Sequence, residues 1–247
     1  MNLVEAGSSH TDWSMIAEAA QEEDTQAAAT AMERLVRRYW PAVYAYIRGR
    51  GHDVHTASDL TQGFVCDVLI SRRLCGGADP TRGRFRGLLL SAVKTYLRHR
   101  HRHEKRKRRS DPSAMRITIT GARREIVDCG PRRTPEAAFC HQFSATLIQR
   151  VLANVRAGCL KDGLDGHWSV FEHRVARPML LGDPPIGYTH LVRRLGLKDA
   201  AQAANMMVTI KRRFANALCV EVSQTVSDPD DTREEIRQLL RDLEGSS

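Results

Sequence analysis

The side chains best suited to chemistry in this chain of 247 residues are cationic, and they crowd into one stretch. Between Arg82 and Arg109 stand twelve Lys or Arg and one acid, Glu104, a net charge of +11. The whole chain carries +9, so the remainder sums to −2 and the positive charge is local. A local field of one sign is typical of a surface that binds nucleic acid or an anionic membrane, although a solvated charged face has the same composition.

A helix is predicted to carry this charge. Seven apolar residues recur with helical spacing just before and within the basic run. They are Phe85, Leu88, Leu89, Ala92, Val93, Tyr96 and Leu97. One face of the predicted helix therefore packs on a core, which argues against a disordered tail.

Other residue types favour neither an enzyme nor a metal site. Of the alternating histidines, only His99 and His103 share a helical face, and the neighbouring Arg and Lys would repel a cation. The six cysteines show no CxxC spacing, so neither a zinc site nor a disulfide framework is predicted. No P-loop, GxSxG motif or paired carboxylates in an apolar setting occur. No catalytic residue, metal or cofactor is predicted.

Hydropathy and charge indicate where the chain resides and how it is divided. No stretch approaches the roughly 18 to 20 apolar residues of a membrane span, and no signal peptide is recognisable, so a cytoplasmic protein without membrane contact is expected. The first thirty residues hold six acids and no Lys or Arg, and the segment after Asp228 is again mostly acidic. Both acidic ends are candidates to fold back on the basic surface.

Periodicity predicts an all-α fold, with two helical domains joined by a linker. Pro41 is expected to bend the first helix or start a second, and Gly49 and Gly51 to end it. Thr56 is the predicted N-cap of the next helix, with Asp59 at its third position. The predicted boundaries are an acidic segment (1–26), a first domain (27–110), a linker (111–133), a second domain (134–226) and an acidic C-terminal helix or tail (227–247).

The second domain is predicted to contain a helix-turn-helix. A helix begins at Thr134 or Pro135, another surrounds Trp168, and a short helix then ends at Gly196. Asp199 and Gln202 form a predicted capping box that starts a long helix. Short helix, glycine turn and long basic helix are the pattern of a DNA-binding helix-turn-helix, which other helical hairpins share. The apolar residues of the long helix are expected to lie mostly in the hydrophobic core of the domain. They are Met206, Met207, Val208 and Ile210.

Several motifs resemble a bacterial RNA polymerase sigma factor of the extracytoplasmic-function type, in a divergent sigma-like subgroup. The run Ala57–Phe64, ASDLTQGF, is similar to the A-x-DLxQ-x-F signature of sigma region 2, and GRFRGLLLSAVKTYLRHRHRHEKR resembles the helix that follows it. TPEAAFCHQF, WSVFEHRVARPML and YTHLVRRLGLKDAAQAANMMVTIKRRF resemble a divergent region 4. The resemblance extends roughly from Met32 to Val226.

The resemblance implies a region 2-like and a region 4-like domain that direct core RNA polymerase to promoters. It implies that Asp59 and Gln62, three apart on one helical face, dock on the clamp helices of the largest polymerase subunit. The alternative is that Asp59 only caps its helix. An anti-sigma factor is a further candidate partner.

Two sets of residues are the candidate DNA contacts. For the minus-ten element they are Arg84, Arg86, Lys94, Arg98, Arg100 and Arg102. For the minus-thirty-five element they are Lys198, Gln202 and Asn205, whose side chains suit base edges, and Lys211, Arg212 and Arg213, which suit phosphates. The tryptophan usual early in the region 2 helix is absent, with Gly87 and Leu88 near its place.

Two other functions stay open on the residues alone. The first is a helix-turn-helix regulator that acts without polymerase. The second is a nuclease or RNA-processing factor that binds its substrate with the basic helix. Co-purification with core polymerase distinguishes a sigma factor from the first. Divalent-metal-dependent cleavage would be required for the second.

Overall fold

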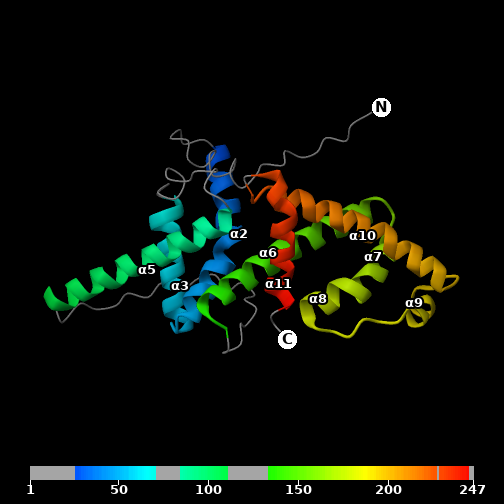
Figure 1. Cartoon of the computed structure of the whole chain (residues 1–247), viewed down its shortest axis with the longest axis horizontal. Coiled ribbons are helices and arrows are strands. Elements are labelled where there is room, and N and C mark those ends of the chain that lie inside the picture. The colour runs from blue at the N-terminus through cyan, green and yellow to red at the C-terminus, as the bar shows by residue number, and fades with distance from the viewer. Residues whose placement is uncertain (1–25, 71–83, 111–132, 227, 245–247) are drawn as a thin grey trace. The chain divides into compact units, whose positions relative to one another are not determined.

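The computed structural model describes residues 26–70, 84–110, 133–226 and 228–244. Within these ranges the regular elements are helices and no strand occurs, which confirms the all-α prediction for this part of the chain (Figure 1). The elements are α2 (Gln26–Gly49), α3 (Val54–Phe64), the π-helix η1 (Val65–Ile70), α5 (Phe85–Ser110), α6 (Pro135–Lys161), α7 (Asp165–Phe171), the π-helix η3 (Glu172–Ala176), α8 (Arg177–Leu181), α9 (Tyr188–Leu195), α10 (Ala200–Ser223), the 3₁₀-helix η4 (Pro229–Asp231) and α11 (Thr232–Glu244).

The chain divides into two compact units. Unit 1 comprises Met1–Phe143 and Ser223–Asp231, and unit 2 comprises Ser144–Val222 and Thr232–Ser247. The division falls inside α6, so the predicted second domain (134–226) is shared between the units. The predicted acidic N-terminal segment (1–26) and linker (111–133) lie almost wholly outside the described residues.

Aromatic rings hold the helices of unit 1 together. Tyr39 of α2 packs against Phe85 of α5 and Phe143 of α6, at centroid distances of 4.7 and 5.7 Å. Tyr96 of α5 meets Phe64 of α3 edge-on at 5.6 Å. All five side chains are buried. Aromatic side chains remove about 150 to 250 Å² each from water, so these contacts supply much of the packing free energy of unit 1.

The first helix is longer than the position of Pro41 alone indicates. α2 continues through Pro41 to Gly49, so Pro41 does not start a second helix. Gly51 adopts a φ of 89°, a left-handed conformation that is inexpensive only for glycine. The predicted stop at Gly49 and Gly51 is therefore confirmed.

The start of α3 corrects a prediction. The N-cap is Asp53, whose carboxylate accepts hydrogen bonds from the backbone N–H (2.9 Å) and the hydroxyl (2.6 Å) of Thr56. Aspartate is at least as good an N-cap as threonine, and its earlier position begins the helix three residues sooner than predicted. Asp59 lies beyond the first turn, so it does not cap α3.

A close approach between α3 and α5 depends on a glycine. A Cβ atom added to Gly63 would lie 2.3 Å from the hydroxyl oxygen of Tyr96. Any larger residue would therefore force the two helices or the Tyr96 ring to shift. Gly63 and the Phe64–Tyr96 ring contact together fix the spacing of α3 and α5.

Unit 2 packs around a second group of aromatic side chains. Phe171 lies 5.8 Å from Trp168 and 5.4 Å from Phe214 of α10, measured between ring centroids. Leu191 of α9 and Ile210 of α10 are fully buried. The predicted helix around Trp168 is confirmed as the consecutive elements α7, η3 and α8.

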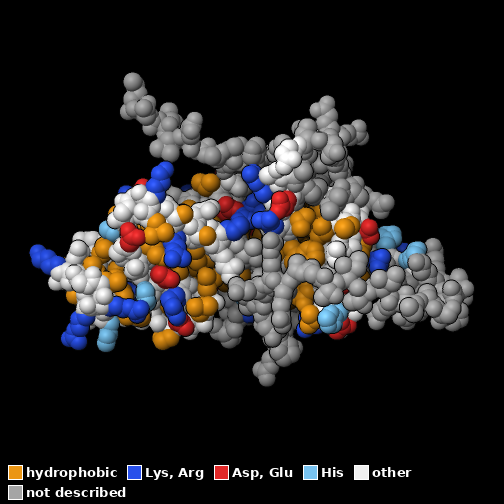
Figure 2. Space-filling model, turned by 180° about the vertical axis from the view of Figure 1, so that it is seen from behind, with side chains coloured by type: hydrophobic (Ala, Val, Ile, Leu, Met, Phe, Trp, Pro, Cys, Tyr) orange, Lys and Arg blue, Asp and Glu red, His pale blue; other side chains and the backbone are white. Residues whose placement is uncertain are grey.

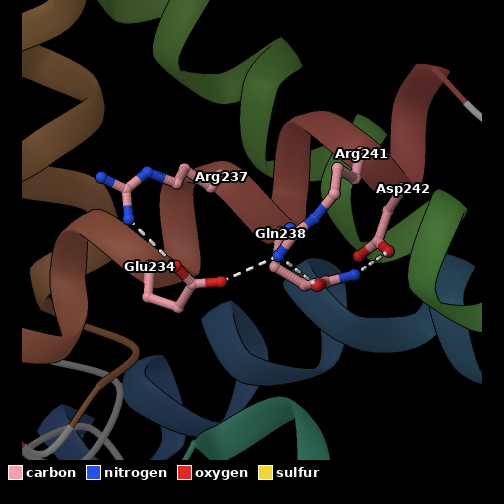
Figure 3. Close-up of polar contacts among 5 residues, drawn as sticks. All are labelled: Glu234, Arg237, Gln238, Arg241 and Asp242. Carbon is pink, nitrogen blue, oxygen red and sulfur yellow. Dashed lines mark hydrogen bonds and ion pairs between the residues drawn. The ribbon is translucent and has the colours of Figure 1, made fainter.

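The acidic C-terminal helix α11 neutralises much of its own charge (Figure 3). The carboxylate of Glu234 accepts hydrogen bonds from Arg237 (3.1 Å) and Arg241 (2.8 Å), and these bonds lower the pKa of Glu234. Gln238 accepts from Arg241 and donates to Asp242 at 2.9 Å. Asp242 also accepts from Ser144 of α6 at 3.4 Å. Because these carboxylates already have partners within unit 2, α11 is a poor source of charge to cover the basic helix.

Membrane insertion through a helix finds no support in the described part of the chain. No helix there combines the length and apolarity that crossing a bilayer requires.

Candidate nucleic-acid interface

The basic part of α5 presents its charge to solvent. Arg98, Arg100 and Arg102 are exposed, and so are the histidines between them. Arg98 donates a hydrogen bond of 3.3 Å to the hydroxyl of Thr95, whereas the side chains of Arg100 and Arg102 make no hydrogen bond or ion pair with other described residues. Like charges on one helix repel, and a bound polyanion would relieve this repulsion.

A groove lies beside these cations. It has a volume of about 910 Å³ and runs between Asp67 and Val68 of η1 and the facing side of α5. Its α5 side is apolar toward the core and cationic or imidazole-bearing toward the helix end, with the lining residues Leu88, Ser91, Ala92, Thr95, Tyr96, His99, Arg100, Arg102 and His103. An apolar floor beside cations suits an unpaired nucleotide, whose base stacks or packs while its phosphate pairs with Arg.

The three candidate minus-ten residues nearer the start of α5 have partners inside the chain. Lys94 forms an ion pair with Glu136 in the first turn of α6, at 2.8 Å. This hydrogen-bonded pair raises the pKa of Lys94 and lowers that of Glu136. Arg84 and Arg86 are half-buried and also engage other groups. The six candidates thus separate into three engaged side chains and three that lie in the exposed stretch 98–103.

The candidate polymerase contacts occupy the outer face of α3. Asp59 and Gln62 are exposed, while Leu60 and Phe64 beside them are buried. Among the residues that the structure describes, neither the side chain of Asp59 nor that of Gln62 has a hydrogen bond or ion pair. Because Asp53 caps α3, capping does not explain the presence of Asp59 on this surface, and no bond within the described chain explains Gln62.

The helix-turn-helix geometry follows from two helix termini. α9 ends at Gly196 in the left-handed conformation (φ 63°, ψ 32°), and the N–H of Leu197 bonds the carbonyl of Val192 at 3.0 Å. α10 starts with a modified form of the predicted capping box, because Gln202 bonds the N–H of Lys198 and not that of the N-cap Asp199. Asp199 accepts from the N–H of Gln202 at 2.8 Å, and the Gln202 side chain accepts from the N–H of Lys198 at 2.7 Å.

Five of the six candidate minus-thirty-five residues lie on α10 and Lys198 lies just before it, but their side chains are not in equivalent states. Lys198, Gln202, Asn205, Lys211 and Arg212 are exposed. The Gln202 carbonyl oxygen is occupied in the capping box, which leaves only its amide N–H groups for a ligand. Arg213 pairs with Asp162, just after α6, at 2.6 Å, and this bond raises the pKa of Arg213.

Sequence reasoning missed the acidic partners and misplaced one apolar residue. Glu136 lies 42 positions from Lys94, and Asp162 lies 51 positions from Arg213. No local sequence pattern predicts ion pairs between residues so far apart. Met206, Met207 and Ile210 are buried as predicted, but the prediction for Val208 is wrong, because its side chain is 67% exposed. A count of helical angles would have found this, since Val208 lies on the same side of α10 as Asn205.

Comparisons with protein families, with characterised proteins and with solved structures return no match. The assignment of a function therefore depends on the residues and their geometry. Within the described residues, no three His, Cys, Asp or Glu side chains are grouped to hold a metal ion.

Proposed function

We propose that this protein is a sigma factor, which binds core RNA polymerase and directs it to promoters. One observation carries the proposal. In unit 1, the exposed Asp59 and Gln62 of α3 and the basic end of α5 belong to helices locked together at Gly63, Phe64 and Tyr96. A surface suited to a protein partner and a surface suited to DNA are therefore held in a fixed relative position.

The proposed mechanism depends on this fixed relative position of α3 and α5. Polymerase docks on α3, which positions α5 against the promoter. Arg98, Arg100 and Arg102 contact phosphates, and the groove between η1 and α5 accepts unpaired nucleotides as the strands separate. Unit 2 contributes its helix-turn-helix, with the start of α10 in the major groove of the minus-thirty-five element.

The docking step is tested by binding to core polymerase. Replacing Asp59 and Gln62 together by Ala removes polar groups that make no intramolecular bond with described residues, so α3 should keep its helix. We expect affinity for core polymerase to fall about tenfold or more, as for interface residues that matter. The control is Gln149→Ala with Asn154→Ala, an exposed polar pair on α6. Equal affinity for the wild type and the α3 variant would reject the docking surface.

A regulator that acts without polymerase is the second candidate. The complete helix-turn-helix inside unit 2 favours it, because that element needs nothing from unit 1 to present α10. The two functions separate in one measurement. A regulator binds its site with the same affinity with or without core polymerase, whereas a sigma factor requires core polymerase for tight promoter binding.

A further inference from the structure

The outward face of α10 carries a defined set of side chains. The buried residues at the start of this helix are Ala203, Met206, Met207 and Ile210. With about 100° between successive residues, four exposed residues fall within an arc of about 60° on the opposite face. They are Ala201, Asn205, Val208 and Arg212.

Val208 has no role in packing this helix against the core. It is 67% exposed, and it lies three positions after Asn205 on the same face. On the face of unit 2 seen in Figure 2, Lys, Arg, Asp and Glu side chains lie among hydrophobic ones. On the outward face of α10, Asn205 presents an amide and Val208 presents methyl groups, and both kinds of group can read base edges.

We propose that Asn205 and Val208 read neighbouring A·T base pairs in the major groove. The Asn205 amide accepts from adenine N6 and donates to adenine N7, and the Val208 methyl groups pack on the C5-methyl of thymine. Three helical residues advance about 4.5 Å, close to the step of about 3.4 Å between base pairs. Arg212, one turn further on, contacts a phosphate. This inference rests on the proposed function and names the sequence class that unit 2 recognises.

The test is chemical removal of single methyl groups from DNA. Holoenzyme first selects duplexes from a pool randomised upstream of a fixed minus-ten element. Each thymine of the selected sequence is then replaced by deoxyuridine, which pairs identically but lacks the C5-methyl. At one thymine, the wild-type holoenzyme should lose about fourfold in affinity, the value expected for one buried methyl group.

Two variants assign that effect to a residue. Val208→Ala should bind the thymine and deoxyuridine duplexes equally at that position. Val220→Ala, another exposed valine on α10 (54% exposed), should keep the fourfold difference. Asn205→Ala should accept any base at the neighbouring pair, while Lys211→Ala should weaken all sequences by the same factor.

The outcomes separate this inference from the proposed function. If holoenzyme selects a sequence but no deoxyuridine substitution matters, or if Val208→Ala keeps the wild-type sensitivity, the reading by Val208 is wrong and the sigma function stands. If no sequence is selected and core polymerase gains no promoter binding, the proposed function fails and the inference fails with it.

Discussion

Tyr96 and Gly63 show how one hydroxyl group sets the distance between α3 and α5. The Tyr96 side chain is buried, and its hydroxyl occupies the space that a Cβ on Gly63 would need. Helical glycine normally costs stability relative to alanine, so its presence here is explained by contact and not by propensity.

We predict that Gly63→Ala destabilises unit 1 by about 1 to 3 kcal/mol, as overpacking does. Tyr96→Phe removes the clashing oxygen, so Gly63→Ala should cost less in that background than in the wild type. Gly158→Ala in α6, which meets no other atom within 4 Å, should instead be neutral or stabilise by up to about 1 kcal/mol. Urea unfolding of the four variants and the wild type measures these differences. An equal cost of Gly63→Ala in both backgrounds would contradict the proposed clash.

Asp53 gives α3 a dependence on pH. Hydrogen bonds from the hydroxyl and the backbone of Thr56 lower the pKa of Asp53 from 3.8 to about 2. The group binds its proton more weakly when folded, so its stabilising contribution is complete above pH 3.8 and declines as the pH falls toward 2.

We expect the Asp53 carboxyl resonance to titrate near pH 2 in the folded protein. The Asp53→Asn variant keeps a good N-cap without the titrating group, so its thermal midpoint should fall less than that of the wild type between pH 5 and pH 3. Parallel declines of the two proteins would show that Asp53 is not held by Thr56.

At the scale of elements, α5 is a packed helix whose residues 98–103 are exposed to solvent. Arg86 and Lys94 of this helix, and Arg84 just before it, are engaged within the chain, whereas Arg98, Arg100 and Arg102 lie in the exposed stretch 98–103. These three should therefore dominate the salt dependence of DNA binding.

We predict that changing Arg98, Arg100 and Arg102 to Ala flattens the log-log slope of holoenzyme affinity against salt by roughly 2 to 3 units, at about 0.7 to 0.9 per phosphate. Promoter opening should decline with affinity, because the same helix holds the separated strand. Lys94→Ala is the matched control, and its slope should change less because Glu136 already neutralises Lys94. If the triple variant kept the wild-type slope, the basic run would be only a solvated face that does not contact phosphates.

Local signals predicted the elements well, and their failures have physical causes. Thr134 accepts from the N–H of Ala137 at 3.2 Å and the Asp199–Gln202 box forms, since a cap needs only residues adjacent in sequence. Thr56 was the wrong cap because Asp53 accepts from the N–H of Thr56 and so starts the helix three residues earlier. The pairing of Lys94 and Arg213 with distant acids could not be predicted, because it arises from how helices meet.

At the scale of the whole molecule, the two candidate DNA-binding surfaces belong to different units. The basic helix belongs to unit 1 and the helix-turn-helix to unit 2, and each presents cations. The predicted competition from the acidic C-terminal end is weakened by the pairs inside α11. The acidic N-terminal segment lies outside the described residues, so its predicted role stays a prediction.

The central claim is that this protein directs core polymerase to promoters, and run-off transcription tests it most directly. Core polymerase is incubated with genomic fragments, with and without the protein, and with the Asp59→Ala, Gln62→Ala double variant. We predict discrete transcripts only when the wild-type protein is present, and a strong loss of these transcripts with the double variant. A folded wild-type protein that adds no transcript to those of core polymerase alone would contradict the claim.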